Sequence, residues 1–468
     1  MDFGTYGTSV TDNDPANLIE FTFGTDVLTP AKENFAPWEL EEEATYRGAS
    51  YRVLITPEGD LTRIKSLHLE FVDPKLNYSV ELDSDGQIKT LRVNGNDIDL
   101  KLDGITLAVT TGTIFPEFRV VRKEANERPP HNYYMYMRRG SQRLIELVEA
   151  FLRPRLSARL TQDRLQEIAV KAMGLGPSPE DTIKHKRHRI GNKSLTNFLN
   201  SLSLEKNADL RREFSNIIAA AYLPQLLNRS TSVFKLMISE TLYIGPARAR
   251  SERYYRYQDL AVSEIDPDGK NFPMFLNSLG SSRLRQLSKW VEGLFGYGLT
   301  VSTEGAGHLS INIIEGKGLS SNLVDVGYGV SQILPVLAQI WWARERLPPA
   351  SIRASVPALL AIEQPELHLH PAHQALLADA IVGEARSNAP DATKRRDVNF
   401  LIETHSETFI NRLGELVSSG KINADDIRII LFEPEASGDR ITTTSIATFN
   451  ADGSLNDWPY GFFQPSIG

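Results

Sequence analysis

From Leu18 to about Gly104 the chain contains runs that alternate between apolar and polar residues or are continuously apolar, which is the pattern of β-strands. Turn signals such as Asp85-Gly86 and Asn94-Gly95 separate the alternating runs and predict hairpins. The predicted strands are Ile19–Phe23, Tyr51–Ile55, Leu61–Phe71, Tyr78–Leu82 and Ile88–Val93. Consecutive hairpins of this kind predict that residues 1–125 form an antiparallel β-rich part.

Helical periodicity replaces this alternation from about residue 129 to residue 227. Apolar residues recur three and four positions apart in several stripes, as at Phe214 and Ile218. The stripes do not keep the seven-residue repeat that a coiled coil requires. We therefore expect residues 126–235 to form a compact helical insertion.

Strands and helices alternate in residues 236–450, which predicts an α/β lobe. Helices are expected over Phe272–Phe295, from Asp325 to about Arg346, and from Ala372 to about Ala385. Strands are expected at Leu299–Ser302, Leu309–Ile314, Val356–Glu363, Asn399–Glu403, Ile427–Phe432 and Ile441–Phe449, with Ile427–Phe432 buried. Residues 451–468 are expected to form a tail module whose aromatic residues dock onto the rest of the protein.

The strand that begins at Val356 carries the clearest chemical signal. It ends in Glu363-Gln364-Pro365-Glu366 and is followed by Leu-His-Leu-His-Pro. A buried strand with an acid at its carboxyl end is the arrangement by which α/β sheets present acids to a ligand. In nucleotide-binding sheets this acid holds magnesium beside the phosphates, as in the Walker B element.

Two flanking segments extend the pattern. Upstream, a helix opens with Gly327-Tyr328-Gly329-Val330-Ser331-Gln332, and downstream the next apolar strand ends in Thr404-His405-Ser406. The three segments, in this order, resemble the C-terminal half of an ABC-type ATPase head. The chain is similar to the AAA/ABC-like ATPases related to overcoming-lysogenisation-defect proteins and, more distantly, to repair and cohesin-type ATPases. The resemblance covers nearly all of the chain, most strongly from Leu242 to the end.

This resemblance implies an α/β fold: an ABC-type head with a mixed sheet, a β-rich lobe and a helical insertion. It implies that Glu363 associates with Mg²⁺, which prefers hard oxygen ligands, and that His405 senses the γ-phosphate of ATP. Gln364 stands where ABC ATPases place the glutamate that polarises the attacking water, and an amide cannot accept that proton. Glu366 is a candidate to replace that glutamate, and hydrolysis is expected to be slow.

The glycine-rich helix start resembles a degenerate ABC signature, through Gly327, Gly329, Ser331 and Gln332. In the family, the signature touches the γ-phosphate bound by the opposite subunit, which implies a dimer. Glycines let the backbone approach the phosphate, and a helix N-terminus favours its negative charge. The competing interpretation is a helix start with a flexible entry.

A strand at Leu242 ends in a Gly-Pro-x-Arg run that also resembles the family. Arg248 and Arg250 follow it and are candidates for contacts with a phosphate or a partner subunit. The alternative is that they pair with local acids such as Glu252.

The Walker A phosphate loop, Gly-x4-Gly-Lys-Ser/Thr, does not occur in the 468-residue sequence. The chain opens with Met1-Asp2-Phe3-Gly4, which resembles the segment that follows this loop in the family. A truncated or mis-started ATPase is the favoured explanation. The alternatives are a split protein completed by another chain and a non-hydrolysing pseudo-ATPase scaffold.

The resemblance therefore implies ATP and Mg²⁺ as cofactors and a nucleotide-dependent dimerising head. A Walker A loop would have to be supplied upstream or in trans. The expected partners are a second copy of the chain or another ATPase chain, together with an effector protein. Phage defence or DNA maintenance is suggested by family analogy alone.

Composition narrows the class of protein. The chain has no cysteine, which excludes disulfides and thiolate metal sites. No apolar run approaches the roughly 20 residues that cross a bilayer, and no signal peptide opens the chain, so a cytoplasmic protein is expected. The net charge of −8 does not favour general binding of polyanions.

Two further clusters invite a functional interpretation. The basic run Lys184–Arg189 could contact nucleic acid, but the favoured interpretation is a solvated loop between helices. His368, His370 and His373 could suggest a metal site, yet they belong to the loop that follows the acid-tipped strand. The loop interpretation is preferred for the histidines.

Overall fold

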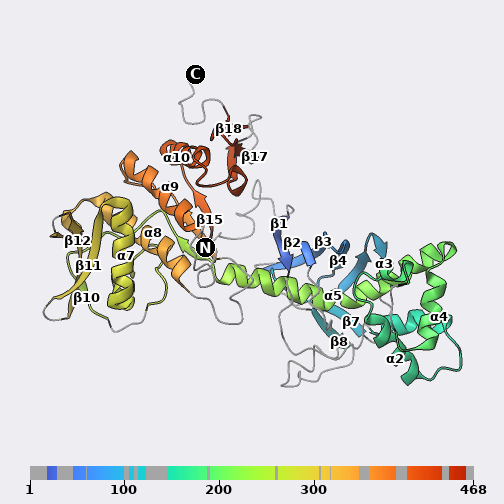
Figure 1. Ribbon diagram of the computed structural model, residues 1–468. Helices are drawn as coiled ribbons and strands as arrows, with labels where there is room; N and C mark the ends of the chain where they lie inside the picture. The colour runs from blue at the N-terminus through green and yellow to red at the C-terminus, as the bar shows by residue number, and fades with distance from the viewer. Residues whose placement is uncertain are drawn as a thin grey trace. The chain divides into compact units, whose positions relative to one another are not determined.

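The computed structural model describes residues 18–28, 46–58, 61–99, 105–109, 114–116, 118–122, 145–186, 190–258, 262–304, 307–316, 318–346, 358–385, 398–434 and 442–459. The chain divides into two compact units, Met1–Lys235 and Leu236–Gly468, and each is described by itself. Figure 1 labels their elements along the chain.

The first unit contains a six-stranded antiparallel sheet in which consecutive strands are neighbours. Its strands are β1 (Ile19–Leu28), β2 (Tyr46–Glu58), β3 (Leu61–Phe71), β4 (Leu76–Leu82), β5 (Ile88–Val93) and β6 (Asn96–Asp97). Along β2 to β5 one face is buried and carries large side chains such as Tyr51, Leu67 and Tyr78. The strands and hairpins predicted from the alternating pattern are confirmed.

Helices follow in the same unit, and the last of them packs on this sheet. They are a helical stretch at 145–152, α2 (Gln162–Met173), α3 (Glu180–Lys184), α4 (Lys193–Leu202) and α5 (Ala208–Ser239), and a two-stranded sheet of β7 (Ile105–Val109) and β8 (Phe118–Arg122) precedes them. The Tyr78 hydroxyl donates to the Ala219 carbonyl at 2.8 Å, and the ring of Phe234 stacks on Tyr51 at 6.1 Å. The predicted boundary at residue 126 stays a prediction, and α5 shares a core with the β layer.

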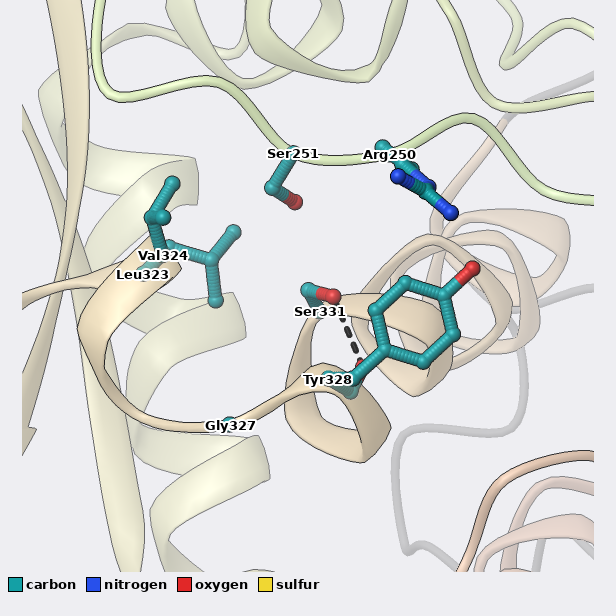
Figure 2. Close-up of a pocket in the computed structure, with 7 residues that line it drawn as sticks. All are labelled: Arg250, Ser251, Leu323, Val324, Gly327, Tyr328 and Ser331. Carbon is teal, nitrogen blue, oxygen red and sulfur yellow. Dashed lines mark hydrogen bonds between the residues drawn. The ribbon is translucent and has the colours of Figure 1, made fainter.

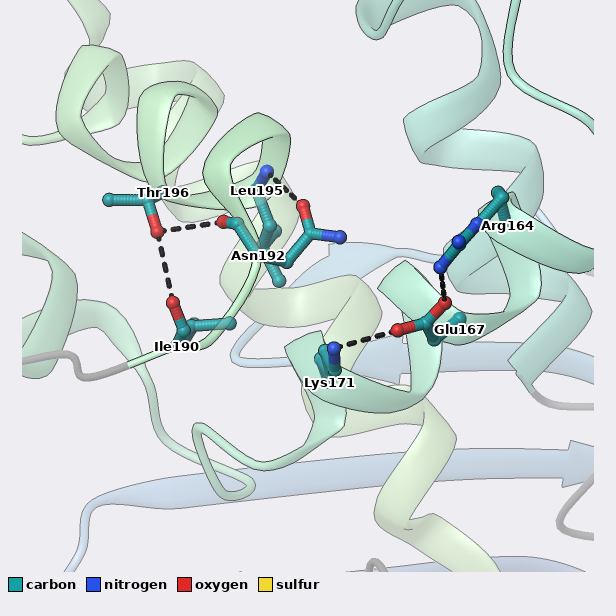
Figure 3. Close-up of polar contacts among 7 residues, drawn as sticks. All are labelled: Arg164, Glu167, Lys171, Ile190, Asn192, Leu195 and Thr196. Atoms are coloured by element: carbon teal, nitrogen blue, oxygen red, sulfur yellow. Dashed lines mark hydrogen bonds and ion pairs between the residues drawn. The ribbon is translucent and has the colours of Figure 1, made fainter.

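Local hydrogen bonds explain where these helices begin and how their surfaces are arranged (Figure 3). The Asn192 side chain caps α4 by accepting the Leu195 N–H at 3.0 Å. On α2, Glu167 accepts hydrogen bonds from Arg164 and Lys171, each at 2.7 Å. Such exposed pairs, three and four positions apart, contribute little to the stability of the helix.

The second unit is built on a three-stranded parallel sheet in the order β15-β14-β9. These strands are β9 (Leu242–Ile244), β14 (Ala358–Glu363) and β15 (Val398–Glu403). Alternate residues of β14 are buried, and the buried face, with Leu360 and Ile362, belongs to the core that also contains α8 and α9 residues. All three strands end at the same edge of the sheet.

Helices and antiparallel strands surround this sheet. The helices are α6 (Phe272–Ser278), α7 (Gly280–Phe295), α8 (Tyr328–Glu345), α9 (Pro371–Ala385) and α10 (Glu407–Ser418). The antiparallel strands are β10 (Tyr255–Arg256), β11 (Tyr297–Glu304), β12 (His308–Glu315), β13 (Leu319–Asn322), β16 (Ile429–Pro434), β17 (Thr442–Phe449) and β18 (Leu455–Asn456). These elements agree with the predicted alternation of helices and strands, and the unit is a mixed α/β structure.

A buried polar cluster joins three of these helices. Arg344 of α8 and Glu384 of α9 form an ion pair at 2.9 Å, and the indole N–H of Trp290 from α7 donates to the same carboxylate at 2.8 Å. The pairing matters because a buried charge without a partner would be costly. The cluster therefore fixes how α7, α8 and α9 pack.

One strand departs from its prediction. The segment predicted as the buried strand Ile427–Phe432 forms β16, but Phe432 is 68% exposed and Ile430 is 51% exposed, whereas Leu431 is only 4% exposed. The prediction of a buried strand was wrong because only one face of the β16-β17-β18 sheet is covered. An apolar run cannot reveal by itself whether one face or both are buried.

The predicted boundary at residue 451 falls inside a hairpin. β18 pairs with β17 through Thr448–Asn456 and Phe449–Leu455, and Gly453 in the intervening turn packs on Gly414 of α10. The two glycines lack side chains, so the turn and the helix backbone approach closely. The beginning of the predicted tail module is thus part of this sheet.

Candidate functional site

The carboxyl edge of the parallel sheet gathers acidic and phenolic groups. Glu363 ends β14 and Glu403 ends β15, and the two residues are register partners, so their side chains leave the same face of the sheet. From β9, the Tyr243 hydroxyl donates to Glu363 Oε1 at 2.7 Å. Two carboxylates and a phenol therefore meet at one point, where ligands bind in open α/β sheets.

The turn after β14 is held in an unusual conformation. Gln364 has φ of 43°, in the left-handed region that non-glycine residues seldom adopt. Its N–H donates to the Glu403 carbonyl at 2.8 Å, its side-chain amide donates to Glu403 Oε1 at 3.3 Å, and its carbonyl accepts from Arg248 at 2.9 Å. Two hydrogen bonds thus fix the Gln364 backbone and a third holds its side chain, and such over-determined outliers are typical of functional sites.

Glu366 lies behind this edge and not on it. Its side chain is 8% exposed, and its Oε1 accepts the backbone N–H of His405 at 2.7 Å. The second oxygen, Oε2, is buried and has no hydrogen-bond partner among the described residues. Glu366 therefore ties the turn after β14 to the turn after β15.

His405 lies in the turn between β15 and α10, and its side chain is exposed. The next residue, Ser406, caps α10 by accepting the Phe409 N–H at 3.0 Å and donates to Gln374 of α9 at 2.6 Å. The cap and the Glu366 contact fix the backbone on both sides of the imidazole. His405 is thus presented to solvent from a rigid turn and is not part of the core.

The environment shifts the pKa of two groups in this network. Burial, followed by the hydrogen bond to Glu363, raises the pKa of Tyr243 to about 12. The nearby Glu403 carboxylate raises it further in the same direction. Burial lowers the pKa of Arg248, and the neighbouring Glu366 carboxylate opposes that shift. Tyr243 is therefore protonated at neutral pH and acts as a hydrogen-bond donor.

The two arginines after β9 have different surroundings. Arg248 is 6% exposed, and its Nε and Nη1 are buried without a hydrogen-bond partner in the described part of the chain. Arg250 is exposed. Neither is described in an ion pair with Glu252, whose N–H instead bonds the Tyr255 hydroxyl at 2.8 Å. The neighbouring ion pair is formed by Arg253 and Asp325.

The glycine-rich start of α8 packs closely on the turn after β14. Gly327, with φ of 112°, precedes the helix. A Cβ on Gly329 would lie 2.7 Å from the His368 carbonyl oxygen, so only glycine fits there without a shift. Ser331 donates to the Tyr328 carbonyl at 2.7 Å, and Gln332 donates to the Ala249 carbonyl at 3.3 Å.

A pocket of about 340 Å³ opens beside this helix start (Figure 2). Arg250 and Ser251 point into it from the segment after β9, opposite Tyr328 and Ser331. Its remaining lining residues are Leu323, Val324 and Gly327. The sequence analysis treated Arg248 and Arg250 as one pair. In the structure, Arg250 lines the pocket beside the signature-like residues, whereas Arg248 contacts the turn at the acidic edge.

The histidines near this turn do not form a metal cluster. His370 Nδ1 accepts the Ala372 N–H at 3.2 Å, His373 packs edge-on against Phe295, and His368 packs edge-on against Tyr328. Across the described residues, no group of three His, Cys, Asp or Glu side chains could hold a metal ion. Likewise, none of the described helices has the length and apolarity to cross a membrane.

Several predicted features lie outside the described residues. These are the Met1-Asp2-Phe3-Gly4 segment, residues 187–189 of the basic run, and Phe462 and Phe463 of the tail. Within the basic run, Lys184, His185 and Lys186 are exposed. The nucleic-acid interpretation of this run stays a prediction.

Sequence reasoning missed two residues of the edge, Tyr243 and Glu403. Glu403 had an available signal, because it ends a predicted strand parallel to the one that ends in Glu363. Tyr243 had none, since it lies 120 positions from its hydrogen-bond partner. Their positions depend on strand order, which periodicity does not specify.

Part of the chain is similar to a known protein family. Residues 281–410 match the family described as "AAA ATPase domain". This range includes the acidic edge, His405 and the start of α8, and it excludes Tyr243, Arg248 and Arg250. No curated protein sequence matches the chain. Residues 281–410 are therefore similar to an AAA ATPase domain, over less than half of the chain.

Solved structures show only weak similarity. A structure from work on ATP-driven dimerization and DNA-stimulated activation of SMC ATPases has 14% identity and a TM-score of 0.25, covering 39% of this chain and 89% of its own. An Smc head domain from Pyrococcus furiosus, bound to the C-terminal domain of ScpA, has 11% identity and a TM-score of 0.22, covering 88% and 79%. One from Pyrococcus yayanosii has 11% identity and a TM-score of 0.25, covering 88% and 84%. Scores of this size do not establish a shared fold.

Proposed function

We propose that the second unit carries part of an ABC-type ATP site and acts as a nucleotide-dependent dimerising ATPase head. The observation that carries the proposal is the meeting of Glu363, Gln364 and His405 at the carboxyl edge of a parallel sheet. This edge lies within the stretch similar to AAA ATPase domains. Ligands bind at such edges in open α/β sheets.

The donor set at the edge suits Mg²⁺ bound with a nucleotide. Mg²⁺ takes hard oxygen ligands and is usually held by one or two carboxylates together with substrate phosphates. Glu363 offers that carboxylate, and the hydrogen bond from Tyr243 orients its Oε1. When bound, Mg²⁺ would neutralise charge on the β- and γ-phosphates.

Other residues have roles toward the γ-phosphate in this proposal. His405, exposed on a fixed turn, contacts the γ-phosphate of the nucleotide bound at its own edge. Gly327, Gly329, Ser331 and Gln332 stand at the start of α8, whose N-terminus favours a phosphate. With Arg250 beside them, they contact the γ-phosphate bound by the opposite subunit, so that two chains complete each site.

A phosphate loop is needed to complete this site. The sequence contains no Gly-x4-Gly-Lys-Ser/Thr, so we propose that the loop is supplied upstream or in trans. The residues described here would then bind ATP weakly without the loop and tightly with it. A partner chain and an effector protein remain part of the proposal, and phage defence or DNA maintenance is its suggested setting.

A second candidate function is a non-hydrolysing scaffold that uses the same edge for binding. The observation that favours it is Gln364, an amide where a water-polarising glutamate is expected. The two candidates differ in hydrolysis, while both retain nucleotide-dependent association.

Equilibrium binding of Mg-ATP to the full chain tests the proposal. Millimolar nucleotide is used because the loop that supplies much of the affinity is absent from the sequence. We expect saturable binding that is lost in Glu363→Gln and weakened in His405→Ala. The matched controls are Glu315→Gln and His308→Ala, two exposed positions on β12. Absence of binding, or equal loss in the controls, contradicts the proposal.

A further inference from the structure

The proposed ATPase lacks an obvious group to accept a proton from the attacking water. Gln364 cannot accept one, and Glu366 was the candidate replacement. Glu366, however, is 8% exposed and its Oε1 is occupied by the His405 N–H. A general base must contact the attacking water, which favours an exposed carboxylate at the same edge over the buried Glu366.

Glu403 is the carboxylate that the fold places at the required point. It ends β15 as the register partner of Glu363, and its side chain is exposed. The Gln364 amide nitrogen lies 3.3 Å from Glu403 Oε1, so the carboxylate is beside the position where a glutamate is expected. Its charge is also felt at the Tyr243 hydroxyl, which bonds Glu363.

The neighbouring amide gives this carboxylate a defined orientation. The Gln364 backbone is fixed by the Glu403 carbonyl and by Arg248. A hydrogen bond from the side-chain amide leaves the other carboxylate oxygen, Oε2, free to turn toward a water molecule at the edge. The side-chain amide oxygen of Gln364 can position that water, while Glu403 accepts the proton.

We propose that Glu403 is the general base of ATP hydrolysis, working with Gln364 as a pair that replaces a single glutamate. This inference rests on the proposed function. The water oxygen forms a bond to the γ-phosphorus, and the bond from that phosphorus to the bridging oxygen breaks, its electron pair leaving with ADP. One water proton moves to the Glu403 carboxylate and is then released to solvent as phosphate departs.

The test compares Mg-ATP binding and single-turnover hydrolysis by the full chain at millimolar Mg-ATP. Glu403→Gln keeps an oxygen that accepts the Gln364 amide hydrogen bond, and it removes the proton acceptor. We expect unchanged binding and a fall in hydrolysis of about 100-fold or more, the usual contribution of a general base. Glu407→Gln, an exposed position in the first turn of α10, is the control and should leave both quantities unchanged.

A double variant separates catalysis from structure. Gln364→Glu combined with Glu403→Gln returns a carboxylate to the position after the Walker B-like acid, and we expect it to recover hydrolysis. Both the single and the double variant can keep a hydrogen bond between positions 364 and 403, so a loss and recovery of hydrolysis at unchanged Mg-ATP binding follows the carboxylate and not that contact. Hydrolysis by Glu403→Gln equal to that of the wild type overturns the inference.

Mg-ATP binding and hydrolysis by the wild-type chain distinguish a wrong role for Glu403 from a wrong proposed function. A wild-type chain that binds Mg-ATP but does not hydrolyse it overturns the role of Glu403 and leaves the binding site standing. A wild-type chain that binds no Mg-ATP overturns the proposed function, and the role of Glu403 falls with it.

Discussion

The space beside Gly329 shows how a single residue sets the contact between α8 and the turn after β14. The His368 carbonyl oxygen occupies the place of a side chain there. His368 itself has φ of 65°, so the turn brings its backbone toward the helix in a conformation that few residues adopt. A glycine at this point is therefore a packing requirement as well as part of a signature-like sequence.

Gly329→Ala should destabilise the full chain. The added Cβ would meet a backbone oxygen at 2.7 Å, and overpacking of this kind costs about 1–3 kcal/mol. Gly383→Ala in α9 is the matched control, because its Cβ would meet no described atom within 4 Å. Alanine there should stabilise the helix by up to about 1 kcal/mol. Urea unfolding measures both, and equal effects contradict the packing argument.

Tyr243 makes stability depend on pH above the neutral range. Its pKa is raised to about 12 in the folded protein, so its contribution is fully present below the ordinary tyrosine pKa of about 10 and is lost as pH rises through about 12. The free energy of unfolding of the wild type should exceed that of Tyr243→Phe near neutral pH. The difference should shrink between about pH 10 and pH 12, as followed by urea unfolding at each pH. A difference independent of pH contradicts the contact with Glu363.

At the scale of elements, β16 shows that an apolar strand can be covered on one side only. Ile430 faces Ile446 across the β16-β17 pair, and both are exposed, whereas Leu431 is buried on the other face. The same holds for β15, where Leu401 is 60% exposed although the strand is mostly apolar. Burial therefore depends on which neighbours cover each face.

Substitutions at two adjacent positions of β16 should separate these faces. Leu431→Ala should cost about 2–5 kcal/mol, the range for emptying a buried leucine site. Phe432→Ala should cost less than about 1 kcal/mol, because its side chain is 68% exposed and only strand propensity is lost. Urea unfolding of the two variants decides, and a larger loss at Phe432 would mean that its face is covered.

At the scale of the whole molecule, the proposed head works only as a pair of chains. The pocket beside α8 is lined by Arg250 and the signature-like residues, and we place the phosphate of an opposite nucleotide there. Arg250 is exposed, so its charge is available to such a ligand. The acidic edge and this pocket would thus belong to different sites of one dimer.

Charge reversal in the pocket should block this association. Arg250→Glu should lose Mg-ATP-dependent dimers in sedimentation velocity, because a carboxylate would repel the phosphate that the arginine attracts. Arg256→Glu reverses an exposed charge on the nearby strand β10 and should dimerise like the wild type. Dimers that form equally in both variants would contradict a role for the pocket.

The sequence by itself determined most of the helices and strands, and it showed that an acidic residue stands at the carboxyl end of a central strand. Alternation and helical spacing are local, so the strands β1–β5 and the helices α7–α9 follow from them, and Glu363 at the end of an apolar strand marks a candidate ligand acid. The sequence also showed that a phosphate loop is missing from the 468 residues. The packing of α5 against the β layer of the first unit could not be inferred from it.

Only the tertiary structure decided which distant residues meet. The parallel register places Glu403 beside Glu363, and strand order places Tyr243 against the same carboxylate across 120 positions of sequence. It also buried Glu366 and Arg248 behind the edge and left Arg250 in a separate pocket. The physical reason is that periodicity reports which face of an element is buried, whereas strand pairing and helix packing decide what lies opposite that face.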